Sequence, residues 1–167
     1  MEIGIAGAGF AVPQKVLTNQ DLEKMVDTSD EWIVTRTGIR ERHIVQPGER
    51  ITDFAVDAAK KACEMANFKP EELDFIISST LTPDRISPAQ AFEIAKNLNV
   101  KRPFCFDLNA ACSGLLYALA AAESFMKTGE IKKGLVTAGE HISRLTDYSD
   151  RNSCVLFGDA AAAIAIT

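Results

Sequence analysis

The sequence predicts an α/β fold with a mostly parallel five-stranded sheet. Short apolar segments typical of buried strands alternate with longer segments of helical periodicity. Capping residues precede several of these helices, and no low-complexity linker or internal repeat interrupts the order. With 167 residues and an apolar content of 47%, the chain is long enough for a single domain with its own core.

The first expected strand is 2–10, where isoleucines alternate with small residues. Its glycines (Gly4, Gly7 and Gly9) suggest a dinucleotide-binding loop. The third glycine of that fingerprint is missing at the required spacing, however, and Pro13 comes before any helix. We therefore expect no phosphate-binding loop here.

Two short helices are expected next, one capped by Thr18 and one starting at Thr28. The second places Thr28, Trp32 and Arg36 on one helical face. Trp32 is the only tryptophan, and an indole beside a guanidinium can stack on a planar base while the cation meets a phosphate. The alternative, a buried Trp32 with a solvated Arg36, is the commoner arrangement for such a pattern.

The segment 36–43 is the only dense basic patch in a chain of net charge −5. This acidity argues against broad nucleic-acid binding, so an anionic ligand would have to be held locally. Such a run is usually a solvated face, but its place directly after Trp32 favours an anion site.

The remaining elements continue the alternation. They are an amphipathic helix at 52–66, a strand at 73–80, a helix capped by Ser87 and opened by Pro88 that ends near 98, strands at 104–108 and 133–140, and a last strand region at 154–157 and 160–166, broken at Gly158-Asp159.

Cys112 lies where the strand 104–108 becomes a helix that Gly129 is expected to end. Unpaired N–H groups and the positive end of the helix dipole favour a thiolate there, which makes Cys112 a candidate nucleophile. The alternative is a small buried apolar thiol, and spacing alone leaves the two about even. From Ala110 to Ala122 the helix carries no charge on any face, so we expect it to pack against a further domain or subunit.

Composition argues against other classes of protein. The longest apolar run, 114–122, is far shorter than the ~20 residues of a membrane span, and the start of the chain lacks a secretory pattern. We therefore expect a cytoplasmic protein. The 4 cysteines form no C-x-x-C pair and there are only 2 histidines, so reduced thiols and no metal site are expected.

Ordered motifs along essentially the whole chain carry a resemblance to a known family. They are Leu17-Thr-Asn-x-Asp-Leu, Thr28-Ser-Asp-Glu-Trp-Ile, Arg36-Thr-Gly-Ile-Arg-Glu-Arg, Ser79-Thr-Leu-Thr-Pro-Asp, Asn109-Ala-Ala-Cys-Ser-Gly-Leu-Leu-Tyr, Asp150-Arg and Leu156-Phe-Gly-Asp. In this order they resemble 3-oxoacyl-[acyl-carrier-protein] synthase III. The resemblance implies a thiolase-like fold, with 1–167 as its amino-terminal αβα half and a second, similar half absent from this chain.

The resemblance implies an acyltransferase that starts fatty-acid synthesis. Cys112 would accept the acyl group of an acyl-CoA primer, expected to be acetyl-CoA, and its N–H would help to form the oxyanion hole. Malonyl-acyl-carrier protein would then lose CO2 and attack the acyl-cysteine. Matching positions assign CoA contacts to Thr28, Trp32, Arg36 and Arg151, and place Leu156 and Phe157 near the acyl pocket.

The resemblance further implies a homodimer, no cofactor beyond the thioester substrates, and a basic entrance at 36–42 for CoA and the carrier protein. Three departures stand out. No segment matches the family's decarboxylating His and Asn, so this chain alone is expected to show little or no condensation. Ala160 and Ala162 replace usual glycines, and 87–92 differs in a region that bears on primer choice.

Two other functions stay open at this point. The chain could be a non-catalytic or split half that binds acyl-CoA and needs a partner chain. It could also be another thiolase-fold condensing enzyme, such as one that makes hydroxymethylglutaryl-CoA, although the motif around Trp32 and Arg36 argues against this.

Overall fold

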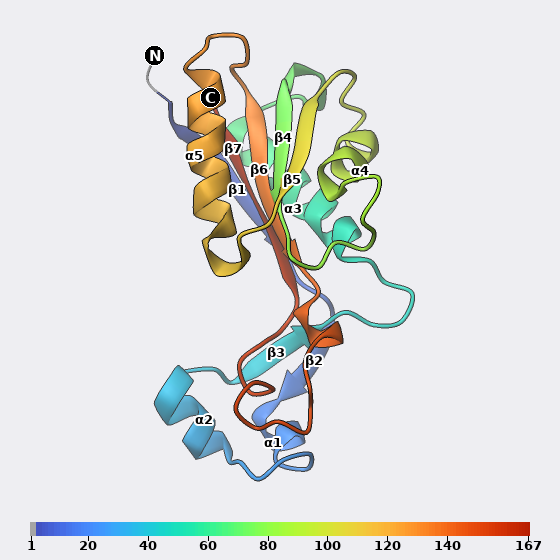
Figure 1. Cartoon of the computed structure of the whole chain (residues 1–167), viewed down its shortest axis with the longest axis vertical. Helices are drawn as coiled ribbons and strands as arrows, with labels where there is room; N and C mark the ends of the chain where they lie inside the picture. Colours follow the sequence, from blue (N-terminus) through green and yellow to red (C-terminus); the bar gives the residue numbers. More distant parts are fainter. Residues whose placement is uncertain (1–2) are drawn as a thin grey trace.

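The computed structural model describes residues 3–167, which form a large lobe around a five-stranded sheet and a small lobe at one end (Figure 1). The strands are β1 (Ile5–Ala11), β4 (Phe75–Ser79), β5 (Phe104–Leu108), β6 (Gly134–Glu140) and β7 (Ala160–Ile166), in the order β1-β7-β6-β4-β5. Only β7 runs against the others. The predicted α/β class with a mostly parallel sheet is confirmed.

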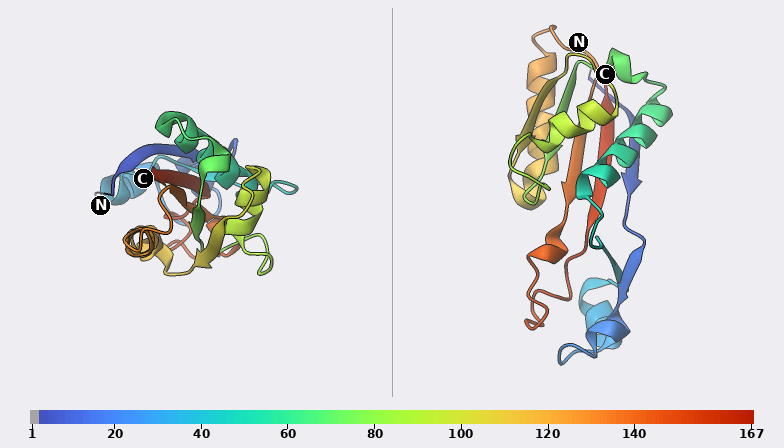
Figure 2. Two further views of the ribbon diagram at one scale, coloured as in Figure 1. Left: turned by 90° about the horizontal axis from the view of Figure 1, so that it is seen from above. Right: turned by 90° about the vertical axis from the view of Figure 1, so that its right-hand side faces the viewer.

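Helices cover the two faces of this sheet to different extents (Figure 2). On one face lie α3 (Ile51–Ala66) and α4 (Gln90–Asn97), and on the other lies α5 (Gly114–Met126). Alternate residues of β7 belong to the two different hydrophobic cores, because successive side chains of a strand point to opposite faces of the sheet. Ala161, Ala163 and Ala165 pack with α3, while Ile164 and Ile166 pack with α5.

The glycines of β1 allow the strand to approach α3 closely. A Cβ on Gly7 would collide with the carbonyl oxygen of Ala62, and one on Gly9 with that of Ala58. The glycine pattern therefore reflects packing of backbone against backbone. The predicted strand began at residue 2, which lies outside the described residues, and β1 begins at Ile5.

The small lobe contains a two-stranded antiparallel sheet that was not predicted. Its strands are β2 (Lys15–Thr18) and β3 (Glu41–Ile44), and its helices are α1 (Asn19–Leu22) and α2 (Asp30–Thr37). Each strand has only four residues, too few to show a clear alternation. Cys154 and Val155 complete this lobe's core with Leu17, Leu22 and Ile33, so the predicted strand at 154–157 is a turn instead.

Side-chain caps explain where three helices begin. Thr18 caps α1 as predicted, accepting from the N–H of Asp21 at 3.2 Å. Helix α2 starts later than predicted, because Ser29 accepts from the N–H of Trp32 at 3.1 Å and leaves Thr28 before the helix. The predicted Ser87 cap of α4 was wrong. Asp107 of β5 instead accepts from the N–H groups of Gln90 and Ala91, at 2.7 and 2.8 Å.

The end of α5 also differs from its prediction. Lys127 is the C-cap, and Gly129 lies two residues further on with φ +82°, its N–H donating to the Met126 carbonyl at 2.9 Å. Single 3-10 turns occur at η1 (Pro70–Glu72), η2 (Ala111–Ser113) and η3 (Ile142–Arg144). Among residues 3–167, no helix combines the length and apolar character needed to cross a lipid bilayer.

Asp84 holds the first turn of α3 from a neighbouring loop. Its carboxylate accepts from the N–H groups of Ile51 (3.2 Å) and Thr52 (2.9 Å) and from the Thr52 hydroxyl (2.5 Å). Burial raises the pKa of Asp84, but these hydrogen bonds and the charge of Arg50 outweigh it, so the pKa lies below its usual value.

We expect Asp84→Ala to lower the free energy of unfolding at pH 7 by about 1–2 kcal/mol, because two N–H groups of α3 lose their acceptor. Because the pKa of Asp84 is lower in the folded than in the unfolded protein, its carboxylate stabilises the fold fully at pH values above the unfolded-state pKa of 3.8. This contribution disappears as the pH falls through the folded-state pKa. Urea unfolding from pH 7 toward pH 3 should show the difference shrinking. Asp57→Ala, at an exposed site on α3, is the control. An equal loss in the control would contradict this capping role.

Candidate active site

Cys112 lies at the junction of β5 and α5, as predicted, on the 3-10 turn η2 that precedes the helix. Its side chain is exposed. The residue before it, Ala111, has φ +46°, a left-handed conformation that alanine rarely adopts. Strain of this kind is often found where a functional side chain must be aimed.

The start of α5 is pressed against β4. A Cβ on Gly114 would overlap the hydroxyl of Ser79, which is buried in β4. The N–H groups of Ser113 and Gly114 donate to the carbonyls of Ala110 and Ala111. Within residues 3–167, the N–H of Cys112 has no backbone acceptor, so it is available to an oxyanion beside the thiol.

The other three cysteines are poor nucleophiles at neutral pH. Burial raises the pKa of Cys63 and of Cys105 to about 11, and burial also raises the pKa of Cys154. A thiolate is the reactive form, so these thiols stay protonated. Exposure therefore distinguishes Cys112 from the rest.

Cys112 opens into a cavity of about 480 Å³. Four large apolar and four polar side chains contribute to its wall, together with Ala111 and Cys112; the lining residues are Leu81, Ala111, Cys112, Glu140, Ile142, Leu145, Thr146, Asp147, Ser153 and Phe157. An apolar wall beside a thiol suits an acyl chain. Leu156 is 44% exposed and lies outside this lining.

Glu140 holds one wall of the cavity in place. Its carboxylate accepts from the N–H of Leu81 at 2.8 Å, from the N–H of Thr82 at 3.1 Å and from the Thr82 hydroxyl at 2.5 Å. Glu140 was not among the predicted site residues. The available signal was a carboxylate at the end of an otherwise apolar strand.

Trp32 lies in the small lobe within cation–π distance of two arginines from different segments. The guanidinium carbon of Arg36 is 4.5 Å from the ring centroid, and that of Arg151 is 4.8 Å away. Each contact contributes about 0.5–1 kcal/mol at an exposed site. Arg151 also lies 3.6 Å from the carboxylate of Asp27. The hydroxyl of Thr28, two residues before α2, is buried with no hydrogen-bond partner within the described part of the chain.

One segment, 145–157, connects these two places. Leu145, Ser153 and Phe157 line the Cys112 cavity, while Arg151 lies over Trp32. A single stretch of backbone therefore links the Trp32 site to the Cys112 cavity. The cavity's other loop residues were missed because loops show no periodicity that predicts where they lie.

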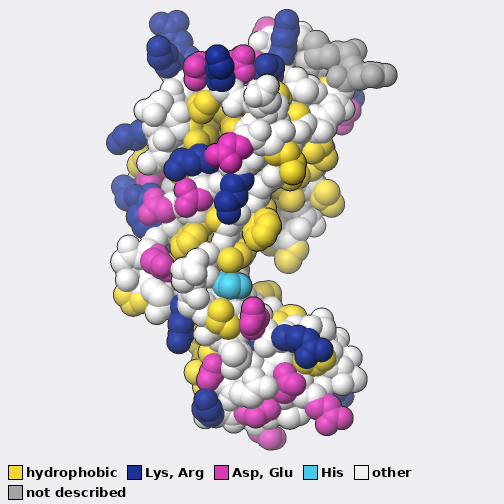
Figure 3. All heavy atoms as spheres, turned by 180° about the vertical axis from the view of Figure 1, so that it is seen from behind, with side chains coloured by type: hydrophobic (Ala, Val, Ile, Leu, Met, Phe, Trp, Pro, Cys, Tyr) yellow, Lys and Arg dark blue, Asp and Glu magenta, His cyan; other side chains and the backbone are white. Residues whose placement is uncertain are grey.

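The predicted basic entrance at 36–42 is smaller than its sequence suggests. Arg36 and Arg40 are exposed, but Arg42 is only 3% exposed and points into the small lobe. Seen from behind, both lobes carry interspersed acidic and basic side chains without one basic field (Figure 3).

Neither histidine lines the Cys112 cavity. The Nδ1 of His43 is 2.6 Å from the Pro13 carbonyl oxygen, and the Nε2 of His141 is 4.0 Å from the carboxylate of Asp159. Ala160 and Ala162 begin β7 and pair with β6 in regular register, so their methyl groups are accommodated in an undistorted strand.

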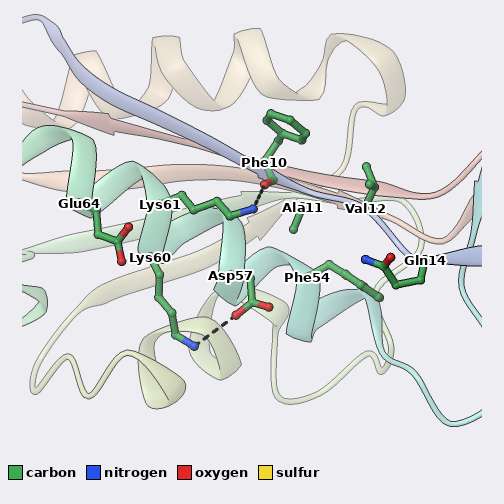
Figure 4. Close-up of a pocket in the computed structure, with 9 residues that line it drawn as sticks. All are labelled: Phe10, Ala11, Val12, Gln14, Phe54, Asp57, Lys60, Lys61 and Glu64. Carbon is green, nitrogen blue, oxygen red and sulfur yellow. Dashed lines mark hydrogen bonds and ion pairs between the residues drawn. The ribbon is translucent and has the colours of Figure 1, made fainter.

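A second groove, of about 450 Å³, lies between β1 and α3 (Figure 4). Lys61 donates to the Phe10 carbonyl at 2.8 Å, and Lys60 lies 3.2 Å from the carboxylate of Asp57. Both lysines thus have acceptors within the groove or at its edge.

Comparison with known proteins gives a consistent result. A family model described as 3-oxoacyl-[acyl-carrier-protein (ACP)] synthase III matches residues 106–167. A β-ketoacyl-[acyl-carrier-protein] synthase III of Caldanaerobacter subterraneus subsp. tengcongensis is 50% identical over 163 residues, covering 98% of this chain and 49% of the relative. The chain spans about half the length of the curated relatives it matches.

Solved structures agree over the same extent. A 3-oxoacyl-[acyl-carrier-protein] synthase III from Aquifex aeolicus VF5 superposes with a TM-score of 0.95 at 51% identity, covering 99% of this chain and 54% of that one. The priming β-ketosynthase of the R1128 polyketide pathway gives 0.94 at 35% identity, with 98% and 49% covered.

Proposed function

We propose that this chain belongs to the 3-oxoacyl-[acyl-carrier-protein] synthase III family, to which it is similar over 98% of its length, and that it carries the acyl-accepting part of a condensing acyltransferase. The observation that carries the proposal is the Cys112 turn, where an exposed thiol lies beside an apolar cavity, together with an N–H that has no backbone acceptor among residues 3–167. The expected substrate class is acyl-CoA, with acetyl-CoA as primer, and no cofactor is required.

In the proposed acylation, Cys112 attacks as its thiolate, and its sulfur forms a bond to the thioester carbonyl carbon of the acyl-CoA. A tetrahedral oxyanion forms and accepts a hydrogen bond from the Cys112 N–H. The intermediate then collapses, the C–S bond to CoA breaks, and CoA leaves as its thiolate. The acyl chain would lie along Leu81, Ile142 and Phe157.

The nucleotide end of CoA would bind at Trp32. Adenine would stack on the indole after displacing the Arg151 guanidinium, which is held by one exposed ion pair and one cation–π contact. The freed arginine and Arg36 would then bind the base or the phosphates. The hydroxyl of Thr28, which has no hydrogen-bond partner in the described part of the chain, offers a further polar contact.

The condensation step would use malonyl-acyl-carrier protein and residues outside this chain, since neither His43 nor His141 reaches the Cys112 cavity. We further propose that a second αβα half covers the outer face of α5, where Leu116 is 67% and Tyr117 58% exposed. A homodimer of the whole protein is expected from the family.

Mass spectrometry of the complete gene product tests this function. Incubation with acetyl-CoA should add one acetyl group per chain and release free CoA in equal amount. If no covalent adduct forms while CoA still binds, the chain would be a CoA-binding protein without this chemistry.

Trp32→Ala is expected to weaken binding of CoA about tenfold to a hundredfold, because stacking on an aromatic ring contributes about 1–3 kcal/mol per base. Calorimetric titration with CoA measures the effect. Trp32→Phe, which keeps an aromatic face, should recover most of the affinity. Equal losses in both variants would contradict stacking on an aromatic face as the source of the affinity.

A further inference from the structure

A buried guanidinium, that of Arg42, lies between the two parts of the proposed site. Arg42 is on β3, and its side chain is closed off from solvent. The Nε donates to the Val155 carbonyl at 3.1 Å, and Nη2 donates to the same oxygen. The Nη1 donates to the side-chain oxygen of Asn19 at 2.5 Å.

Asn19 continues the network into the helix that carries Trp32. Its side chain is fully buried, and its Nδ2 donates to the carboxylate of Asp30 at 2.7 Å and to the Ile39 carbonyl at 2.9 Å. Asp30 is the first residue of α2, and Ile39 follows its C-cap, Gly38. Asn19 thus holds both ends of α2 and passes that constraint to Arg42.

Val155 ties the same network to the Cys112 cavity. It lies two residues before Phe157, which lines the cavity, and four residues after Arg151, which covers Trp32. The Val155 carbonyl, which accepts two hydrogen bonds from Arg42, therefore anchors the segment 145–157, which reaches both places. A change at Arg42 would free this segment and α2 from each other.

Burying the charge of Arg42 costs more free energy than a purely structural role requires. Its hydrogen-bond acceptors, as far as residues 3–167 show, are a carbonyl and an amide rather than a carboxylate. Burial lowers the pKa of Arg42, which reflects the cost of keeping the charge away from water. Apolar residues of similar volume often replace buried charges without loss of stability. Apolar residues cannot reproduce the planar guanidinium, whose N–H groups donate three hydrogen bonds in fixed directions.

We propose that Arg42 is a positioning residue for acyl transfer: it sets the separation between the Trp32 site and the Cys112 cavity. With the nucleotide of CoA held at one end, the thioester carbonyl then reaches the Cys112 sulfur at the other. This inference rests on the proposed function and adds to it the residue that aligns the two ends.

Acylation of Cys112 by two thioesters tests the inference, in the protein as its gene encodes it. Acetyl-CoA uses both ends of the site, whereas acetyl-pantetheine lacks the nucleotide. Arg42→Lys keeps the charge and loses the fork, and we expect it to lower kcat/KM for acetyl-CoA about tenfold while acetyl-pantetheine changes less than about twofold. Arg102→Lys, at an exposed site, is the matched control and should leave both unchanged.

Equal reductions for both thioesters, or no reduction for either, would overturn the positioning role. Asn19→Ala is the second variant, for use if Arg42→Lys does not fold; it cuts the link to α2 and should give the same selective loss. The proposed function is tested separately by the wild type. A wild-type protein that neither thioester acylates refutes that function, whereas an acylated wild type with unselective variants refutes only the role of Arg42.

Discussion

Replacement of Cys112 by serine is expected to abolish transfer of the acetyl group from acetyl-CoA, with a reduction on the order of a thousandfold or more. A serine hydroxyl ionises far less readily than a thiol. Neither histidine of the chain lines the cavity, so no imidazole stands ready there to take the proton. Quenched-flow mass spectrometry of the acyl adduct gives the rate.

The control is Cys105→Ala, on the strand that leads to the same turn. Burial raises the pKa of Cys105 to about 11, so its removal should leave the acylation rate within about twofold of the wild type. An adduct that persists in Cys112→Ser, or that disappears in Cys105→Ala, would move the nucleophile to another side chain.

Gly114→Ala is expected to lower the free energy of unfolding by about 1–3 kcal/mol and to slow acylation at least about tenfold. The added methyl group would collide with the Ser79 hydroxyl, and the start of α5 would have to move away from β4. Cys112 lies two residues before Gly114, so any such movement shifts its sulfur. Chemical denaturation and the acylation rate measure the two effects.

A second substitution separates this collision from other effects of alanine. Ser79→Ala removes the hydroxyl and leaves the Ser79 Cβ 3.3 Å from the added methyl, a tight but tolerable contact. The double variant should therefore recover most of the stability and rate lost in Gly114→Ala. If it recovers neither, the close approach of α5 to β4 does not explain the glycine.

Local signals in the sequence predicted much of the sheet and its helices. The strand 104–108 was predicted with its observed bounds, because apolar residues end there in a polar turn. The position of Cys112 followed from that boundary. The ordered motifs predicted that Trp32, Arg36 and Arg151 share one site, and the structure places both guanidinium groups beside the ring.

Contacts between residues far apart in the sequence could not be predicted in this way. Asp107 caps α4 from another strand, and no local pattern distinguishes it from an ordinary strand residue. Arg42 looked like part of a basic surface, since a charge in a basic run gives no sign of burial. The anchoring of the segment 145–157 at Val155 likewise depends on Arg42, more than a hundred positions away.

A crystal structure of the protein with CoA bound would test the central claim most directly, namely that one substrate spans the small lobe and the Cys112 cavity. We predict adenine stacked on Trp32 with Arg151 moved off the ring, and the CoA sulfur within van der Waals contact of the Cys112 sulfur. CoA bound in the groove of Lys60 and Lys61, or bound at Trp32 with its thiol directed away from Cys112, would contradict the account.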